Sequence, residues 1–190
     1  MMSIDEWLRV VLIGVGATAV MDVWGMIQKA MGITTLNYAM VGRWAGHLCR
    51  GQIAHVQISR AEPINGELPL GWVIHYAVGV AFAALLIGVY GVAWLHHPTL
   101  LPAVLVGVVT VLIPFFVMQP AMGAGIAATR TPTPWINRLR SVLTHAVFGG
   151  GLYLSATLLP LVWEYTERLA ILRSIAHISM MGVFHLLSIF

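Results

Sequence analysis

The chain has 190 residues, of which 59% are hydrophobic and only 9% are charged. Soluble domains carry roughly a quarter charged residues, so this composition excludes a soluble globule and indicates helices that span a membrane. The formal net charge of +3 is small and no basic stripe with interleaved aromatic residues is present, so nucleic acid is not an expected partner. The single cysteine, Cys49, excludes an intrachain disulfide.

Four apolar segments are long enough to cross a hydrocarbon core of about 30 Å at about 1.5 Å per residue. These predicted helices comprise residues 7–30, 70–95, 100–119 and 141–163. A fifth apolar segment, residues 169–190, contains Arg173 and either crosses the membrane or lies in its interface. The sequence therefore predicts an all-α, polytopic helix bundle that forms a single integral membrane domain over residues 1–190.

The connections between the predicted helices differ in charge. Seven basic residues lie in or beside the connections that follow the first and third helices: Lys29, Arg43, Arg50, Arg60, Arg130, Arg138 and Arg140. The opposite side has only three: Arg9, Arg168 and Arg173. Cytoplasmic connections of membrane proteins are enriched in Lys and Arg, so this bias predicts that the two long connections are cytoplasmic and that the N-terminus lies outside.

One polar side chain interrupts each of the four predicted helices: Asp22, His75, Gln119 and His145. Asp22 and Gln119 lie toward the cytoplasmic ends of their helices, and both histidines lie about 7 Å below the starts of theirs. All four residues therefore fall in the same leaflet. Ionisable groups inside a membrane face the interior of a bundle and usually pair, so we expect Asp22 to contact His75, His145 or both.

The two halves of the chain share a short pattern. Val-Met-Asp22 in the first helix corresponds to Val-Met-Gln119 in the third. His75-x-x-x-Gly79 in the second helix corresponds to His145-x-x-x-Gly149 in the fourth. The pattern favours a helix-pair repeat of parallel orientation, in which the glycines let helix backbones approach closely.

The residue types of this polar cluster leave several interpretations open. Asp, His and Gln can simply hydrogen-bond between helices. An Asp–His pair can relay protons, because histidine titrates near neutral pH. His75 and His145 could instead be axial ligands of a haem, and Asp22 with both histidines could bind zinc or iron. Haem and a metal ion therefore stay open as cofactors.

Three further residues are secondary candidates. Glu67 lies close to the expected layer of histidines and is the best additional acid. Arg43 and His47 belong to a short amphipathic helix that the pattern predicts from Asn37 to Arg50. No serine–histidine–acid set, Walker loop or His-Glu-x-x-His motif is present, so an enzyme is not the favoured interpretation.

Several stretches together resemble a family of small bacterial integral membrane proteins that is filed as a domain of unknown function. These stretches are Ala17-Thr-Ala-Val-Met-Asp-Val-Trp24, Gly42-Arg-Trp-Ala-Gly-His47, Gly71-Trp-Val-Ile-His-Tyr76, Pro114-Phe-Phe-Val-Met-Gln-Pro-Ala-Met-Gly123 and His145-Ala-Val-Phe-Gly149. The resemblance covers roughly residues 3–165. It implies a multi-pass protein of the bacterial inner membrane with about four helices, and it brings no activity.

The favoured functional hypothesis is a small carrier or channel-like protein that moves a proton, an ion or a small solute through the polar cluster. An accessory or assembly subunit of a larger membrane complex is the first alternative, with a partner membrane protein or a second copy against its apolar surface. A haem- or metal-binding redox protein of the membrane is the second.

Overall fold

A computed structural model describes the backbone of residues 2–187 and the side chains of residues 2–161. Within this part of the chain every regular element is helical, as the composition predicts. The α-helices are α1 (Ile4–Ala30), α2 (Tyr38–Leu48), α3 (Glu67–Tyr90), α4 (Ala93–His96), α5 (Leu100–Val109), α6 (Gln119–Ala121) and α7 (Pro134–Leu187). Two 3₁₀ turns, Ile58–Arg60 and Ile126–Ala128, and a π-helix, Pro114–Met118, complete the described elements.

Four helical segments in the described residues are long and apolar enough to cross a membrane: Ile4–Ala30, Glu67–Tyr90, Leu100–Ala121 and Pro134–Leu161. Each of them overlaps one of the four spans predicted from the sequence, with differences at the ends. Less than half of each segment's most apolar stretch is buried inside the protein. The remaining apolar side chains are exposed, as expected of helices that face lipid.

The ends of the first two spans differ from the predicted ones, and local chemistry explains both. α1 begins at Ile4 because Ser3 and Glu6 form a capping box that satisfies backbone N–H groups at the helix start. The second helix was expected to reach residue 95, but it ends at Tyr90. Gly91 follows with a φ of 83°, a left-handed conformation that glycine adopts without strain.

The third span is interrupted, which corrects the expectation of one regular helix over residues 100–119. Proline has no backbone N–H, so Pro114 cannot continue the α-helical hydrogen bonds. α5 ends at Val109, and the chain resumes as a π-helix in which the backbone N–H of Gln119 donates to the carbonyl of Pro114. Gln119 is therefore carried on an irregular segment, and its position does not follow from a regular helix.

The fourth and fifth predicted segments are parts of one helix. α7 begins at Pro134, seven residues before the predicted start, and is continuous to Leu187. The predicted residues 188–190 lie outside the described part of the chain. By packing, the chain divides into two units after Ala156, within the turn that precedes Pro160. Pro160 removes one backbone hydrogen bond from the helix interior.

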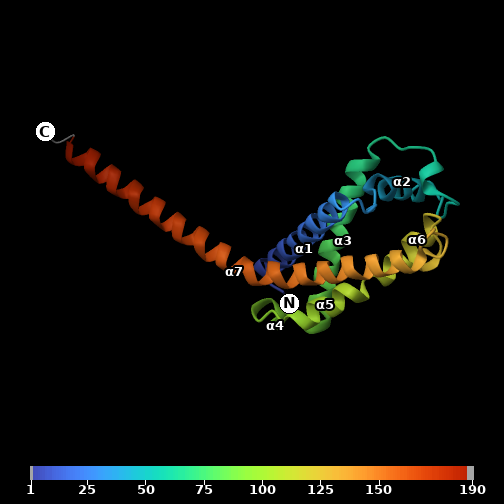
Figure 1. Ribbon diagram of the computed structural model, residues 1–190. Coiled ribbons are helices and arrows are strands. Elements are labelled where there is room, and N and C mark those ends of the chain that lie inside the picture. Colours follow the sequence, from blue (N-terminus) through green and yellow to red (C-terminus); the bar gives the residue numbers. More distant parts are fainter. Residues whose placement is uncertain (1, 188–190) are drawn as a thin grey trace. The chain divides into compact units, whose positions relative to one another are not determined.

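Glycines mark two close helix crossings in the first unit. α1 and α3 lie side by side (Figure 1), and a Cβ added to Gly14 would lie 2.6 Å from the backbone of Val80. α5 and α7 cross in the same way, because a Cβ on Gly107 would lie 2.7 Å from Gly149 Cα. The predicted repeat thus has a counterpart in packing, since each half contains a glycine-mediated crossing at or near its His-x-x-x-Gly pattern.

The two long connections meet at one end of this unit. The backbone N–H groups of His55 and Ile58 donate to the carbonyls of Ala121 and Met122, at 2.8 and 3.1 Å. At the other end, Glu6 of α1 lies 3.8 Å from His96 of α4, and Figure 1 shows the N-terminus beside α4. The connections after the first and third spans therefore lie on the same side, as the topology of four spans requires.

Candidate functional site

Asp22, in the second half of α1, contacts a histidine of α3. His75 Nε2 lies 2.9 Å from Asp22 Oδ1, and the two side chains are only 12% and 15% exposed. The contact predicted from the sequence is therefore confirmed for His75. The close crossing of α1 and α3 at Gly14 and Gly79 positions the pair, because it holds the two backbones near enough for short side chains to meet.

Two tyrosines complete the cluster, and sequence reasoning missed both. The Tyr76 hydroxyl donates to Asp22 Oδ2 at 2.9 Å. The Tyr38 hydroxyl lies 2.9 Å from His75 Nε2 and 3.4 Å from Asp22 Oδ1. Burial and the adjacent Asp22 raise the pKa of Tyr38 above its usual value, so this phenol keeps its proton. We call Asp22, Tyr38, His75 and Tyr76 the Asp22 cluster.

Four close polar contacts join the residues of the Asp22 cluster, which is more than the protons available to fill them. An ionised Asp22 only accepts, so His75 Nε2 must then be protonated and donate to Oδ1. The Tyr38 oxygen can accept from the same N–H while its own proton points to Oδ1. A further proton can bind at Nδ1 of His75 and convert the pair into an imidazolium and a carboxylate. The same heavy-atom arrangement therefore suits two protonation states.

Helix α2 delivers Tyr38 to the cluster. Asn37 caps this helix through its side chain, which accepts from the backbone N–H of Ala39. A Cβ on Gly42 would collide with the carbonyl of Glu67, and a Cβ on Gly71 would collide with that of Tyr38. The backbones of α2 and α3 are therefore in direct contact.

Aromatic rings line one side of the cluster as a result. The Tyr38 ring stacks on His75 at a centroid distance of 4.2 Å and packs against Trp72 at 4.4 Å. Trp72 also lies 5.8 Å from the His75 ring and 6.3 Å from that of Tyr76.

His145, also predicted to join the cluster, makes a different contact. Its Nδ1 lies 3.0 Å from the Thr110 hydroxyl at the end of α5. No hydrogen bond joins it to Asp22 among the described residues. Gln119 has no hydrogen-bond partner for its buried Oε1 in the same part of the chain. Of the three residues predicted to share a layer with Asp22, only His75 forms a hydrogen bond with it.

Glu67 does not extend the layer of histidines. Its carboxylate forms a two-pronged ion pair with Arg43, at 2.8 Å to Nε and 2.7 Å to Nη2. Arg43 also donates to the carbonyl of Ala61 at 3.1 Å, and Glu67 accepts from the backbone N–H of Ile64. Two of the three secondary candidates therefore fasten α2 and the following connection to the start of α3.

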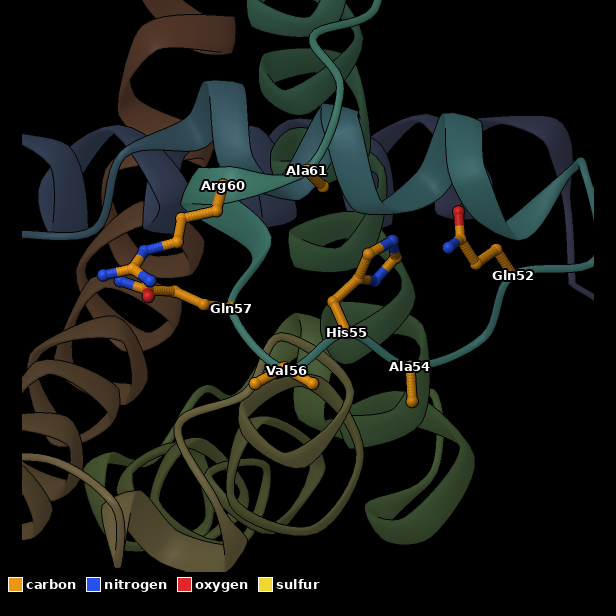
Figure 2. Close-up of a pocket in the computed structure, with 7 residues that line it drawn as sticks. All are labelled: Gln52, Ala54, His55, Val56, Gln57, Arg60 and Ala61. Carbon is orange, nitrogen blue, oxygen red and sulfur yellow. The ribbon is translucent and has the colours of Figure 1, made fainter.

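His47 is tied into the same connection. Its ring nitrogens lie 2.8 Å from Gln52 Oε1 and 2.9 Å from the carbonyl of Glu62. His55 packs edge-on against this ring, and both nitrogens of His55 are buried without a partner among the described residues. A hollow of about 360 Å³ lies along this stretch (Figure 2), lined by Gln52, Ala54, His55, Val56, Gln57, Arg60 and Ala61. None of these residues belongs to the Asp22 cluster.

The cofactors considered from the sequence find little support in these contacts. Among the described residues, no three His, Cys, Asp or Glu side chains come together as a metal site would require. For a haem, His75 would have to give up its contacts with Asp22 and Tyr38 to offer Nε2 as an axial ligand. The donor set instead suits hydrogen bonding and the exchange of protons.

The fold and the cluster define a class: a bundle of helices long enough to cross a membrane, in which a carboxylate, an imidazole and two phenols gather where two of these helices meet the short helix α2. The family model described as "Protein of unknown function (DUF2938)" matches residues 11–159. The chain belongs to this family, which confirms the resemblance seen in the motifs. No curated protein and no solved structure is similar enough to this chain to count as a match.

Proposed function

We propose that this protein is a small membrane carrier that moves protons, alone or together with an ion or small solute, through the Asp22 cluster. The observation that carries the proposal is that Asp22 has no lysine or arginine partner among the described residues. It faces His75 instead, a side chain that can bind and release a proton. A purely structural acid in a membrane gains more from a permanent cation, as Glu67 does from Arg43.

The proposed orientation follows from the charges of the connections. Of the eight basic residues up to Ala156, seven lie in or beside the two connections that meet at one end, and only Arg9 lies elsewhere. We place this end in the cytoplasm and the N-terminus outside. The motifs, which resemble bacterial integral membrane proteins, support the inner membrane of a bacterium as the location.

Proton flux into liposomes tests the proposal. Purified protein is reconstituted into liposomes that contain a pH-sensitive dye, and a potassium gradient with valinomycin drives proton entry. We expect the wild type to acidify the interior faster than empty liposomes do. Asp22→Asn should reduce the rate to that of empty liposomes, because an amide hydrogen-bonds between helices but does not ionise.

Asp5→Asn is the matched control, since Asp5 is an exposed acid at the start of the same helix. Its flux should equal that of the wild type. If the cluster only ties helices together, each contact contributes about 0.6 to 2 kcal/mol, and Asp22→Asn should then transport normally. That result would falsify the proposal.

The second candidate function is an accessory subunit of a membrane complex. The observation in its favour is that α7 continues to Leu187, beyond the fourth apolar segment, and that residues after Ala156 form a separate unit by packing. Purification from native membranes at a fixed stoichiometry with another membrane protein, lost when the chain is truncated after Leu161, would favour this function over transport.

A further inference from the structure

The contacts of His145 determine where its proton lies. The Thr110 hydroxyl donates to the carbonyl of Gly107 over an O···O distance of 2.6 Å. Two oxygens come so close only with a proton between them, so the single hydroxyl proton is committed to Gly107. The Thr110 oxygen, 3.0 Å from His145 Nδ1, must then accept. Nδ1 carries the proton, and the neutral ring has a bare nitrogen at Nε2.

The backbone explains why this arrangement forms. Val111, which would donate to Gly107 in a regular helix, donates to Val108 instead, where α5 gives way to the segment before Pro114. The carbonyl of Gly107 is thereby free for the hydroxyl. The crossing of α5 and α7 brings the two partners together, since a Cβ on Gly107 would lie 2.6 Å from the carbonyl oxygen of His145.

The Nε2 atom has no hydrogen-bond partner among the described residues, and the residue as a whole is only 9% exposed. α5 contributes no ionisable side chain to its surroundings. A largely buried imidazole whose Nε2 makes no hydrogen bond among the described residues therefore lies in the second half of the molecule.

We propose that His145 is a second proton-binding site, that the proton binds at Nε2, and that Thr110 is the positioning residue that fixes this choice. The inference rests on the proposed function and extends it by a second site. Binding forms one N–H bond at Nε2 and converts the neutral ring into an imidazolium, and release of the proton restores the neutral ring.

Nitrogen NMR of histidine-labelled protein in detergent tests the tautomer, with the His145 signals assigned from a His145→Gln spectrum. We expect a protonated Nδ1 and a bare Nε2 in the wild type. Thr110→Val, which keeps the shape but cannot accept, should move the proton toward Nε2, and Thr110→Ser should keep the wild-type pattern. A wild-type ring protonated at Nε2, or a tautomer unchanged by Thr110→Val, overturns the assignment. If Thr110→Val does not fold, the wild-type and Thr110→Ser spectra decide alone.

Flux separates this inference from the proposed function. His145→Gln should lower the proton flux several-fold, whereas His97→Gln, in the exposed connection before α5, should not. Normal flux in His145→Gln together with loss in Asp22→Asn would remove the second site and keep the carrier. If the wild-type protein shows no proton flux, both the carrier proposal and the proposed role of His145 are wrong. The NMR spectra then still test which nitrogen of His145 carries the proton.

Discussion

At the residue scale, Asp22 and Glu67 are both partly buried acids but have different kinds of partner. Glu67 faces the permanent charge of Arg43, so its own charge is fixed. Asp22 faces an imidazole and two phenols, and the charge of that group changes with one proton. The first pair stabilises the structure, whereas the second can take part in a cycle of protonation and release.

Arg43→Lys should destabilise the protein. Lysine cannot donate two parallel N–H groups to Glu67 and also reach the carbonyl of Ala61, so part of a nearly buried network is left unpaired. We expect a loss of about 1 to 2 kcal/mol in the free energy of unfolding, because lysine keeps the charge but loses hydrogen bonds. Thermal unfolding in detergent measures it. Arg50→Lys is the control, because Arg50 is exposed in the same connection and has no ion pair among the described residues. Equal effects of the two changes would contradict the structural role of Arg43.

Gln119→Leu should leave stability unchanged or raise it by about 1 kcal/mol. The buried Oε1 of Gln119 accepts no hydrogen bond, so leucine removes a polar atom that gains nothing from its position. Chemical denaturation of the reconstituted protein measures the change. A clear loss of stability would show that Gln119 has a partner in the membrane, such as a bound solute or water.

The sequence supports the Asp22–His75 contact because ionisable residues are rare inside membranes and these two lie at matching depth. It does not reveal Tyr38 and Tyr76, because tyrosine is common near membrane interfaces and carries no such signal. Their positions were nevertheless suggestive, since Tyr76 follows His75 directly and Tyr38 follows the helix cap Asn37. The sequence also does not show that His145 contacts Thr110, because this contact depends on where α5 ends.

At the element scale, the helix breaks decide how far the two halves resemble each other. Thr18 in α1 and Thr110 after α5 each donate to a glycine carbonyl one turn earlier, Gly14 and Gly107. In the first half α1 continues regularly from this point and brings Asp22 to His75. In the second half the irregular segment around Pro114 follows, so Gln119 does not take the corresponding place.

The helices themselves were predictable, because runs of apolar residues of this length have few alternatives. Their ends were less so. Gly91 ends α3, and Pro114 interrupts the α-helical hydrogen bonds of the third span, although both lie inside apolar stretches.

Gly149→Ala should weaken the crossing of α5 and α7. The added Cβ would lie 2.7 Å from both the carbonyl of Ala103 and Val104 Cα, and backbone atoms cannot move aside cheaply. We expect a loss of about 1 to 3 kcal/mol in stability. The control is Gly150→Ala on the same helix, where the new Cβ meets nothing within 4 Å.

Gly150→Ala should be neutral or stabilising by up to about 1 kcal/mol, since alanine favours the helix. Thermal unfolding of both variants in the same detergent provides the comparison. If Gly150→Ala is the more harmful of the two, the crossing is not located at Gly149.

At the scale of the whole molecule, the single native cysteine can be used to measure the orientation of the protein in the membrane. Cys49 is the single cysteine and is exposed at the end of α2, in the connection that holds Arg43 and Arg60. The backbone bonds from His55 and Ile58 to Ala121 and Met122 join this connection to the other long one. The accessibility of Cys49 therefore reports on which side of the membrane both long connections lie.

Cys49 in the wild-type protein should resist a membrane-impermeant thiol reagent in intact bacterial cells and react after the membrane is permeabilised. The expectation follows from the basic residues of this side, because Lys and Arg are retained in the cytoplasm during insertion. The control places a cysteine at exposed Thr99, between α4 and α5, in a Cys49→Ser background. Thr99→Cys should be labelled in intact cells, since one crossing by α3 separates it from the cytoplasmic end.

Labelling of Cys49 with protection of Thr99→Cys would invert the orientation and put the Asp22 cluster in the outer leaflet. Labelling of both Cys49 and Thr99→Cys in intact cells would mean that α3 does not cross the membrane. This result would contradict a proton carrier whose site lies between α1 and α3.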